Sequence, residues 1–425
     1  MIKKIIFFSI GVITLYSVDS YSKFAINNTT IWWALLISIL ILFYMGKSRY
    51  FSARNEDNIT FVKLYLFWNV VCIVRGLFVA QGYWEWKFLI QTSLVLLLPF
   101  CVYVVTNTFL VQKIVQQWFR YMLPAFFVFY LFISAEAVGH YLIPVSFILL
   151  FFPFLNTKWR IITICMALVV FSANLGARSN VIKFIVPMAL AMTYYFTFTF
   201  SKKVFKIART VFIILPIILL YLGITNIFNV FKMSEYIEGD YKFQKEDAAG
   251  GQEDLTSDTR TFLYEEVINS ALKYNYVWLG RTPARGNESP SFGPEIDKDL
   301  GTHKMERHSN EVSILNVFTW TGIVGVILYF LIFFKATYLA IYKSKSRIMK
   351  IIGLYLSFRW AYTWVEDFSM FNLSYFFLWV VIGMCLSQDF REMSDQEFKN
   401  WVRGIFDERY RKAIVKKQLV TLKEI

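Results

Sequence analysis

Residues 306–341 read ERHSNEVSILNVFTWTGIVGVILYFLIFFKATYLAI, and this stretch decides the fold class. A short polar string ends at Glu311, and an apolar run continues from there to Ile341. An α-helix needs about 20 residues to cross the hydrocarbon core of a bilayer. The run is longer than one crossing requires, so we expect a spanning helix with an interfacial or re-entrant turn before Gly322.

Apolar runs of this kind recur along the whole chain of 425 residues. Hydrophobic residues make up 57% of it and charged residues 17%, whereas about a quarter of a soluble domain is charged. Because the runs are continuous rather than alternating, they favour helices over a β-barrel. We predict an all-α polytopic membrane protein with about 12 transmembrane helices, near residues 5–18, 31–45, 61–80, 88–106, 119–134, 141–154, 161–175, 181–200, 211–229, 311–341, 349–364 and 371–387.

Lysine and arginine in the short connections set the orientation, because basic residues are retained on the cytoplasmic side. Every second connection is basic, and these connections carry Lys47, Arg49, Arg54, Lys113, Arg120, Lys158, Arg160, Lys202, Lys203, Lys206, Arg209, Lys343, Lys345, Arg347 and Lys350. The formal charge of +14 follows this alternation, so we expect a lipid bilayer and no nucleic acid as partner. The prediction is an inner (cytoplasmic) membrane protein with both termini cytoplasmic.

The same pattern divides the chain into four parts. We expect an N-terminal transmembrane bundle at 1–230, a large extracytoplasmic loop at 231–310, C-terminal transmembrane helices at 311–388 and a basic cytoplasmic tail at 389–425. No small-residue cleavage site follows the first apolar run, so this run is predicted to remain as an uncleaved span. The tail is predicted to be an amphipathic helix on the anionic inner leaflet.

The large loop has one predicted helix. Its acidic start, residues 235–258, has low hydrophobicity and the small-residue sequence AAGG at 248–251, so we expect a flexible segment there. Residues 258–273 are predicted to form an amphipathic helix near the membrane surface, with Asp258 as its N-cap and Trp278-Leu279-Gly280 as its end. The apolar positions at helical spacing are Phe262, Leu263, Val267, Ile268 and Leu272.

Arginines are the main candidates for a site, because a guanidinium donates two hydrogen bonds to a phosphate group and keeps its charge. For each of them, a solvated surface or lipid-headgroup contact is the alternative interpretation. Ionisable groups inside spans are costly and either line a polar cavity or snorkel to the interface. We expect an anion site on the outer face, formed by Arg75, Arg178, Arg260, Arg281 and Arg307, with Arg285 as a further candidate. Glu366 and Asp367 are expected to pair with Arg75 and Arg359.

His308 is the candidate for proton transfer, because imidazole titrates near neutrality. It lies in the same polar string as Arg307. The spacing of His303 and His308 differs from that of a helical zinc site, so we expect neither a metal nor another cofactor. An incidental loop histidine is the alternative interpretation.

The order of these features resembles the O-antigen ligase and polymerase superfamily, whose polymerases are called Wzy-like. Arg260 heads the predicted helix, Trp278-Leu279-Gly280 follows, and Arg307-His308-Ser309-Asn310 runs into a span containing Gly322-Ile323-Val324-Gly325. The segment 172–180, which includes Arg178, is similar to a further signature of that family. The distance from Ser309 to Gly322 is longer than in the ligase branch, which favours a polymerase.

This resemblance implies a metal-independent inverting glycosyltransferase that polymerises undecaprenyl-pyrophosphate-linked oligosaccharide repeat units into O-antigen, capsule or exopolysaccharide. His308, Arg260 and Arg307 would then be catalytic, and Arg75, Arg178, Arg260 and Arg281 would bind the pyrophosphate. The expected partners are the lipid-linked oligosaccharide, an acceptor glycan and a chain-length regulator. The alternatives are a ligase that transfers the glycan to lipid A core or protein, a flippase or transporter of the same lipids, and a transferase with a dolichol-type phosphate donor.

Overall fold

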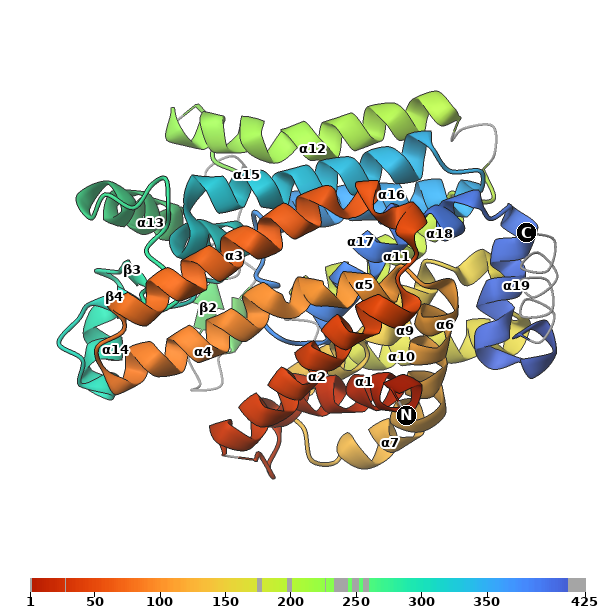
Figure 1. Ribbon diagram of the computed structural model, residues 1–425, viewed down its shortest axis with the longest axis horizontal. Coiled ribbons are helices and arrows are strands. Elements are labelled where there is room, and N and C mark those ends of the chain that lie inside the picture. Colours follow the sequence, from red (N-terminus) through yellow and green to blue (C-terminus); the bar gives the residue numbers. More distant parts are fainter. Residues whose placement is uncertain are drawn as a thin grey trace.

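The computed structural model describes residues 2–26, 28–173, 178–196, 201–225, 227–232, 244–246, 252–254 and 260–411. Helices dominate it, as predicted (Figure 1). They are α1 (Ile2–Val18), α2 (Thr29–Tyr50), α3 (Thr60–Val79), α4 (Tyr83–Leu97), α5 (Val102–Val105), α6 (Thr108–Gln117), α7 (Leu123–Phe129), α8 (Ala135–Tyr141), α9 (Ile143–Leu149), α10 (Thr157–Ala173), α11 (Arg178–Met192), α12 (Lys202–Ile224), α13 (Thr261–Lys273), α14 (Gly293–Leu300), α15 (Ser313–Tyr342), α16 (Arg347–Tyr362), α17 (Leu373–Leu386), α18 (Gln388–Glu392) and α19 (Asp395–Phe406). Short antiparallel pairs join β1 (Gln244–Glu246) to β2 (Gln252–Asp254) and β3 (Asn287–Glu288) to β4 (Glu306–Arg307).

The helices identify a membrane protein. In the described ranges, five helical stretches are long and apolar enough to cross a bilayer: Thr29–Tyr50, Ala53–Val79, Tyr83–Val105, Lys202–Ile224 and Ser313–Tyr342. Ser179–Met192 and Leu373–Leu386 are shorter apolar helices. The class of all-α membrane protein is confirmed, and the full number of about 12 spans stays a prediction.

The helix expected at 119–134 begins earlier than predicted. α6 starts at Thr108 because the Asn107 side chain accepts hydrogen bonds from the Phe109 and Leu110 amides, each at 3.1 Å. A π-helical turn, Trp118–Met122, then joins α6 to α7. Lys113 and Arg120, which the sequence analysis placed in a connection, are therefore helical residues.

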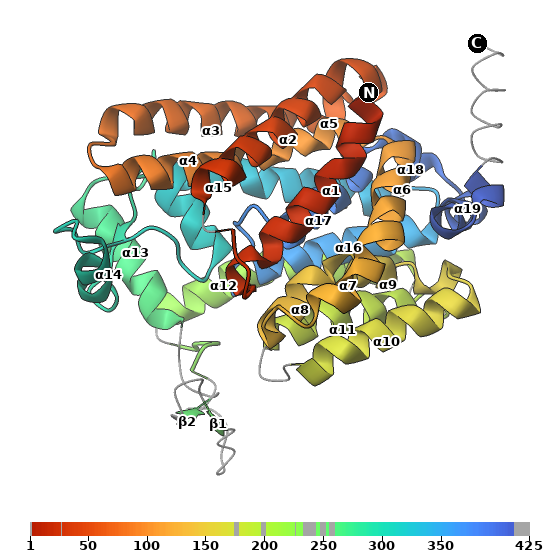
Figure 2. The same ribbon diagram turned by 90° about the horizontal axis from the view of Figure 1, so that it is seen from below.

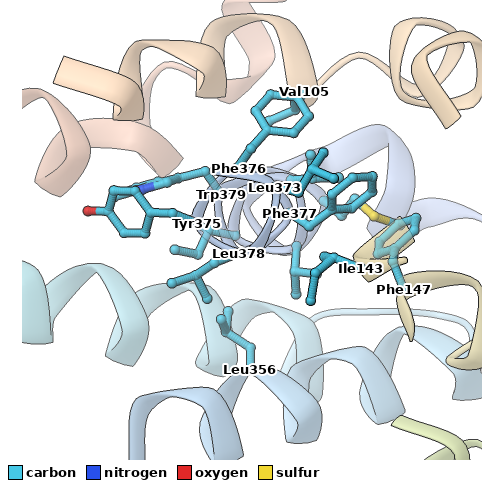
Figure 3. Packing of buried hydrophobic residues seen from close by; sticks show 14 of the residues in the cluster. Val105, Ile143, Phe147, Leu356, Leu373, Tyr375, Phe376, Phe377, Leu378 and Trp379 are labelled. Atoms are coloured by element: carbon cyan, nitrogen blue, oxygen red, sulfur yellow. The ribbon is translucent and has the colours of Figure 1, made fainter. Parts of the chain in front are cut away.

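α17 forms the centre of the bundle. All 14 of its residues are buried, as expected for a helix that is apolar on every side. Figure 3 shows its side chains pointing outward in all directions, toward Val105 of α5, Ile143 and Phe147 of α9, and Leu356 of α16. The core of the protein therefore surrounds this helix.

α12 lies on the outside of the bundle and packs on α16 and α15 (Figure 1). Of its residues, only Phe205, Arg209, Ile213 and Pro216 are buried. Apolar side chains on its other face, such as Ile217 and Tyr221, are 48% and 63% exposed. A soluble protein rarely exposes so continuous an apolar surface, so this face is suited to contact lipid.

The polar parts of the chain gather at opposite ends of the helices. α13 and α14 lie at one end, and α18 and α19 lie at the other, in both views (Figures 1 and 2), and β3 and β4 lie beside α13 and α14 in Figure 1. The site described below is at the end with α13 and α14. The predicted orientation makes this end extracytoplasmic.

α19 corrects the prediction for the tail. It is amphipathic, but Phe398, Trp401, Val402 and Ile405 are at most 1% exposed, and the helix packs on α6. The indole Nε1 of Trp401 donates to the Thr108 carbonyl at 2.8 Å. The apolar face therefore meets protein rather than the lipid leaflet, and residues 412–425 lie outside the described residues.

The amphipathic helix of the large loop is confirmed as α13. Leu263, Val267 and Ala271 are at most 1% exposed and lie four residues apart, so they form one buried face. Asp258 and the AAGG segment lie outside the described residues. The helix ends at Lys273, before the predicted Trp278–Gly280 segment, because Asn275 takes up a left-handed conformation with φ of 57°.

Candidate functional site

The large loop meets α15 where that helix is interrupted. Gly322 has φ of 69° and ψ of −173°, so α15 is interrupted at this residue, while the interfacial or re-entrant turn expected before Gly322 stays a prediction. Residues 277–281 lie against the break: the Ile323 amide donates to the Val277 carbonyl at 2.9 Å, and the Arg281 amide to the Thr319 carbonyl at 2.7 Å. The loop thereby forms hydrogen bonds with main-chain groups that have no partner within the interrupted helix.

Two glycines make this contact possible. Gly280 and Gly322 both have positive φ, 71° and 69°. A Cβ on Gly280 would lie 2.5 Å from the Gly322 nitrogen, and a Cβ on Gly322 would lie 2.3 Å from the Trp278 carbonyl oxygen. Neither the backbone conformation nor the space admits a side chain. The Trp278–Gly280 segment therefore serves to dock the loop on α15.

Arg75 supports the same junction from α3. Its Nη1 donates to the Leu279 carbonyl at 2.5 Å and its Nη2 to the Gly280 carbonyl at 3.2 Å. Trp68, two turns earlier on α3, donates from Nε1 to the Thr321 carbonyl at 2.8 Å. The guanidinium that was predicted to bind pyrophosphate is thus engaged by main-chain oxygens of the loop.

A first group of charges, here called the Glu306 cluster, consists of Glu306, Arg281, Arg285, Glu85 and Lys304. Arg281 Nη2 lies 2.9 Å from Glu306 Oε1, and Arg285 Nε lies 2.8 Å from Glu306 Oε2. Lys304 pairs with Glu85, whose Oε1 is also 3.6 Å from Arg285 Nε. Burial raises the pKa of Glu306, but the hydrogen bond from Arg285 and the two arginine charges outweigh it, so the pKa is lowered and the carboxylate is ionised.

His308 lies beside this cluster and is half-buried. Its ring stacks on Phe88 with centroids 3.6 Å apart and an interplanar angle of 19°. Burial lowers the pKa of the imidazole from 6.5 to about 4, although the Glu306 charge acts in the opposite direction. One ring nitrogen hydrogen-bonds to the main chain of Ala284, and Nε2 has no partner among the described residues. A neutral imidazole in this arrangement offers a lone pair at Nε2.

A second group, here called the Glu311 cluster, consists of Arg260, Arg307 and Glu311. Arg260 Nη1 pairs with Glu311 Oε2, and Arg307 Nη2 is 3.2 Å from Glu311 Oε1. The Arg307 guanidinium also lies over the Phe292 ring, 4.3 Å from its centroid. The Glu311 side chain is 51% exposed, so one accessible carboxylate holds two arginines.

Strand β4 explains why the two clusters are separate. Successive side chains of a strand point to opposite faces, and Glu306 and Arg307 are its two residues. Their partners on β3 are Glu288 and Asn287. Glu306 therefore joins one cluster and Arg307 the other, and His308 follows directly.

Two further cations, Lys183 and Arg359, lie on α11 and α16. Lys183 of α11 pairs with Glu366 at 3.2 Å, and its side chain is 4% exposed. Arg359 of α16 donates from Nη1 to the Tyr355 hydroxyl at 3.1 Å, while Nε and Nη2 have no partner in the described ranges. Glu366 was expected to pair with an arginine, so Lys183 corrects this prediction. A lysine inside an otherwise apolar run was the sequence signal for it.

The predicted arginines thus occupy different places. Arg260 and Arg307 come together on Glu311, and Arg281 and Arg285 come together on Glu306. Arg178 is the first residue of α11, and its side chain lies outside the described residues. The sequence analysis did not select Glu85, Glu306 or Glu311. In the described part of the chain, no three His, Cys, Asp or Glu side chains form a group that would hold a metal ion.

An apolar groove opens next to the Glu311 cluster. Its volume is about 480 Å³, and α12, α13 and α16 line it with Phe212, Leu219, Tyr264, Ile268, Phe358 and Val365 among others. The carbonyl of Val365 accepts a hydrogen bond from Arg260 Nε at 3.4 Å. Most of the lining residues are apolar, although Asn229, Thr261, Glu265 and Asn269 also line the groove, and Arg260 contacts it through Val365.

Comparisons with protein-family models, with curated proteins and with solved structures found no match for this chain. The resemblance to the O-antigen ligase and polymerase superfamily therefore stays a prediction.

Proposed function

We propose that this protein polymerises undecaprenyl-pyrophosphate-linked oligosaccharide repeat units into a surface polysaccharide, such as O-antigen, capsule or exopolysaccharide. The reaction takes place at the extracytoplasmic face of the inner membrane, and both termini are cytoplasmic. One observation carries the proposal: Arg260 and Arg307 converge on a single accessible carboxylate, and Arg260 also hydrogen-bonds to Val365, which lines an apolar groove. This arrangement suits a ligand with an anionic head and a long apolar tail.

The groove would hold the polyprenyl chain. A cavity of about 480 Å³ lies within the range of 300 to 1,000 Å³ that small-molecule sites occupy, and it accommodates part of such a chain. α12 forms one wall of the groove, and the other face of this helix is apolar and exposed. A lipid in the bilayer could therefore enter sideways without leaving the hydrocarbon layer.

The two arginines would stabilise the leaving group. In the proposed reaction, an acceptor hydroxyl oxygen attacks the anomeric carbon of the donor glycan, the bond from that carbon to the pyrophosphate oxygen breaks, and the configuration inverts. Negative charge grows on the pyrophosphate as it departs, and preorganised cations there are the largest source of rate enhancement. Glu311 occupies the place of that anion when no substrate is bound.

His308 would take the proton of the acceptor hydroxyl. Burial lowers the pKa of His308 to about 4, so the imidazole is neutral at physiological pH and Nε2 can accept. Glu306 and its arginine partners position the segment that carries His308. Arg281, which was expected to bind pyrophosphate, acts in this proposal by holding Glu306.

Complementation of a deletion strain tests the proposal. Wild type should restore a ladder of surface glycan on a gel, whereas Arg307→Ala and His308→Ala should give a single repeat unit on its acceptor. Arg409→Ala is the control, because its side chain is 88% exposed and distant in sequence from both clusters. If the deletion strain instead accumulates full-length polymer on undecaprenyl pyrophosphate, the protein is a ligase. Ladders that persist in both variants would rule out the site.

A further inference from the structure

A second cavity, with a volume of about 260 Å³, lies at the outer end of α4. Its walls are the first turn of α4, from Gly82 to Glu85, and the segment from Gly301 to His308. Sites for drug-sized ligands usually begin at about 300 Å³. This cavity is therefore suited to a single small ring rather than to a lipid.

One wall of the cavity is aromatic. Tyr83 and Trp84 line it, and Tyr83 is 71% exposed. Trp84 stacks on Phe88 with centroids 6.2 Å apart, and Phe88 stacks on His308. Aromatic faces offer large apolar contact areas with a polar rim, which matches the C–H face and the hydroxyls of a pyranose ring.

The other wall is charged. Glu85 and Glu306 line it and are 5% and 6% exposed. The Gln81 amide donates to Glu85 Oε2 at 2.6 Å, and the Gly82 amide donates to it at 3.3 Å, so this carboxylate is fixed. Lys304 is the single cation among the lining residues. Lys304 pairs with Glu85, and Arg281 and Arg285 pair with Glu306 from outside the lining. The lining therefore offers no unpaired cation to a phosphate, whereas hydroxyl groups can donate to carboxylate oxygens.

The unpartnered nitrogen of His308 connects this cavity with the proposed reaction. His308 lines the cavity, and its buried Nε2 has no partner in the described ranges. Buried polar atoms are nearly always satisfied, so this atom points to a ligand. A sugar hydroxyl in the cavity would meet the lone pair that is needed to accept its proton.

We propose that this cavity is the acceptor-sugar subsite, which binds a neutral pyranose ring through the aromatic faces of Tyr83 and Trp84 and the carboxylate of Glu85. The inference rests on the proposed transferase function and adds to it the location and chemical class of the acceptor. The pyrophosphate of the donor binds elsewhere, at the Glu311 cluster. Glu85 is a specificity-determining residue in this account, and His308 receives the proton from the hydroxyl that it orients.

The test uses the purified full-length protein with two probes. The donor is the single-unit lipid that accumulates in the deletion strain, and the acceptor is the free oligosaccharide released from that lipid by mild acid. Tyr83→Ala changes an exposed side chain, and Glu85→Gln keeps the shape but removes the charge. Glu288→Gln is the matched control, because Glu288 pairs with Lys273 at 2.8 Å outside the cavity.

We expect both variants to raise the KM for the free acceptor about tenfold, which corresponds to the loss of a charge-assisted hydrogen bond or of a ring contact. Their kcat at saturating acceptor should stay within about threefold of wild type. Binding of the free oligosaccharide without donor, followed by tryptophan fluorescence, should weaken by the same factor. Glu288→Gln should match wild type in both assays.

The two readouts separate this inference from the proposed function. If wild type elongates the acceptor and both variants have the same KM for the acceptor as wild type, the assignment of the subsite is wrong, while the proposed transferase function stands. If wild type transfers no glycan, the transferase proposal fails, and the binding of the free oligosaccharide alone then tests whether the cavity is a sugar site. Binding lost in Tyr83→Ala and Glu85→Gln would support a sugar site, and unchanged binding would overturn it.

Discussion

Glu311 offers the sharpest perturbation of the anion site. Its carboxylate pairs with Arg260 on one side and with Arg307 on the other. An anion that takes both guanidinium groups must displace it. Glu311→Gln keeps the volume of the side chain and removes the competing charge, so we predict that the variant binds inorganic pyrophosphate more tightly than wild type.

The size of the effect follows from the exposure of the carboxylate. The Glu311 side chain is 51% exposed, so water screens both pairs, and an exposed ion pair contributes about 0.2–1 kcal/mol. Two such pairs together give about 1 kcal/mol, which corresponds to roughly a fivefold gain in affinity. Because the competition is electrostatic, the gain should shrink at high salt.

Titration calorimetry of the detergent-purified protein with inorganic pyrophosphate measures this effect. Glu288→Gln, which removes a carboxylate paired with Lys273, should leave the affinity unchanged, and Arg307→Ala should weaken binding. Equal or lower affinity in Glu311→Gln would show that Glu311 does not compete with an anion. Unchanged affinity in Arg307→Ala would show that the anion binds elsewhere.

Three further predictions concern the junction and His308. Gly322→Ala should destabilise the protein by about 3 kcal/mol, because of the positive φ and overpacking, and should lower its apparent Tm in detergent by about 5 °C or more. Gly223→Ala is the control and should leave the Tm unchanged, because a Cβ there meets no atom within 4 Å. Equal Tm values for the two variants would contradict the docking of the loop on α15. Arg75→Lys should lower the Tm by removing donors to two loop carbonyls, at about 1–3 kcal/mol, and an unchanged Tm would show that these bonds are dispensable. Because burial lowers the pKa of His308 to about 4, the unfolded chain takes up this proton first as the pH falls, so stability should decrease from pH 6.5 to about 4 by about 3 kcal/mol. His308→Gln should flatten that part of the stability curve, and a curve identical to that of wild type would refute the shifted pKa.

The sequence predicts the elements of this fold well where a pattern is local. The length of the apolar run after Glu311 indicated that it is more than one straight span, and the structure has a break in α15 at Gly322. The apolar spacing after Arg260 indicated the helix that α13 forms. Both features depend on residues that are close in sequence, so periodicity and length contain the necessary information.

The environment of each element was harder to predict. α19 is amphipathic whether its apolar face meets lipid or protein, and sequence cannot distinguish these cases. In the structure, Trp401 and its neighbours pack on α6. For α19, the prediction of a helix bound to the lipid leaflet was wrong for this reason.

The partners of the charged residues also could not be predicted from the sequence. Lys304 and Glu85 are separated by 219 positions, and no local pattern links them. Arg75 was selected because charge within a span is costly, but the carbonyls of Leu279 and Gly280 that satisfy it become available only when the loop docks on α15. Candidate arginines could therefore be found, whereas their division into two clusters could not.

Chain elongation by the purified protein tests the central claim most directly. The protein is reconstituted into liposomes with the single-unit lipid from the deletion strain, and the products are separated by size. The account predicts a ladder of two, three and more repeat units, release of undecaprenyl pyrophosphate with each new bond, and neither product with Arg307→Ala or His308→Ala. Folded wild-type protein that leaves the single-unit lipid unchanged would contradict the account.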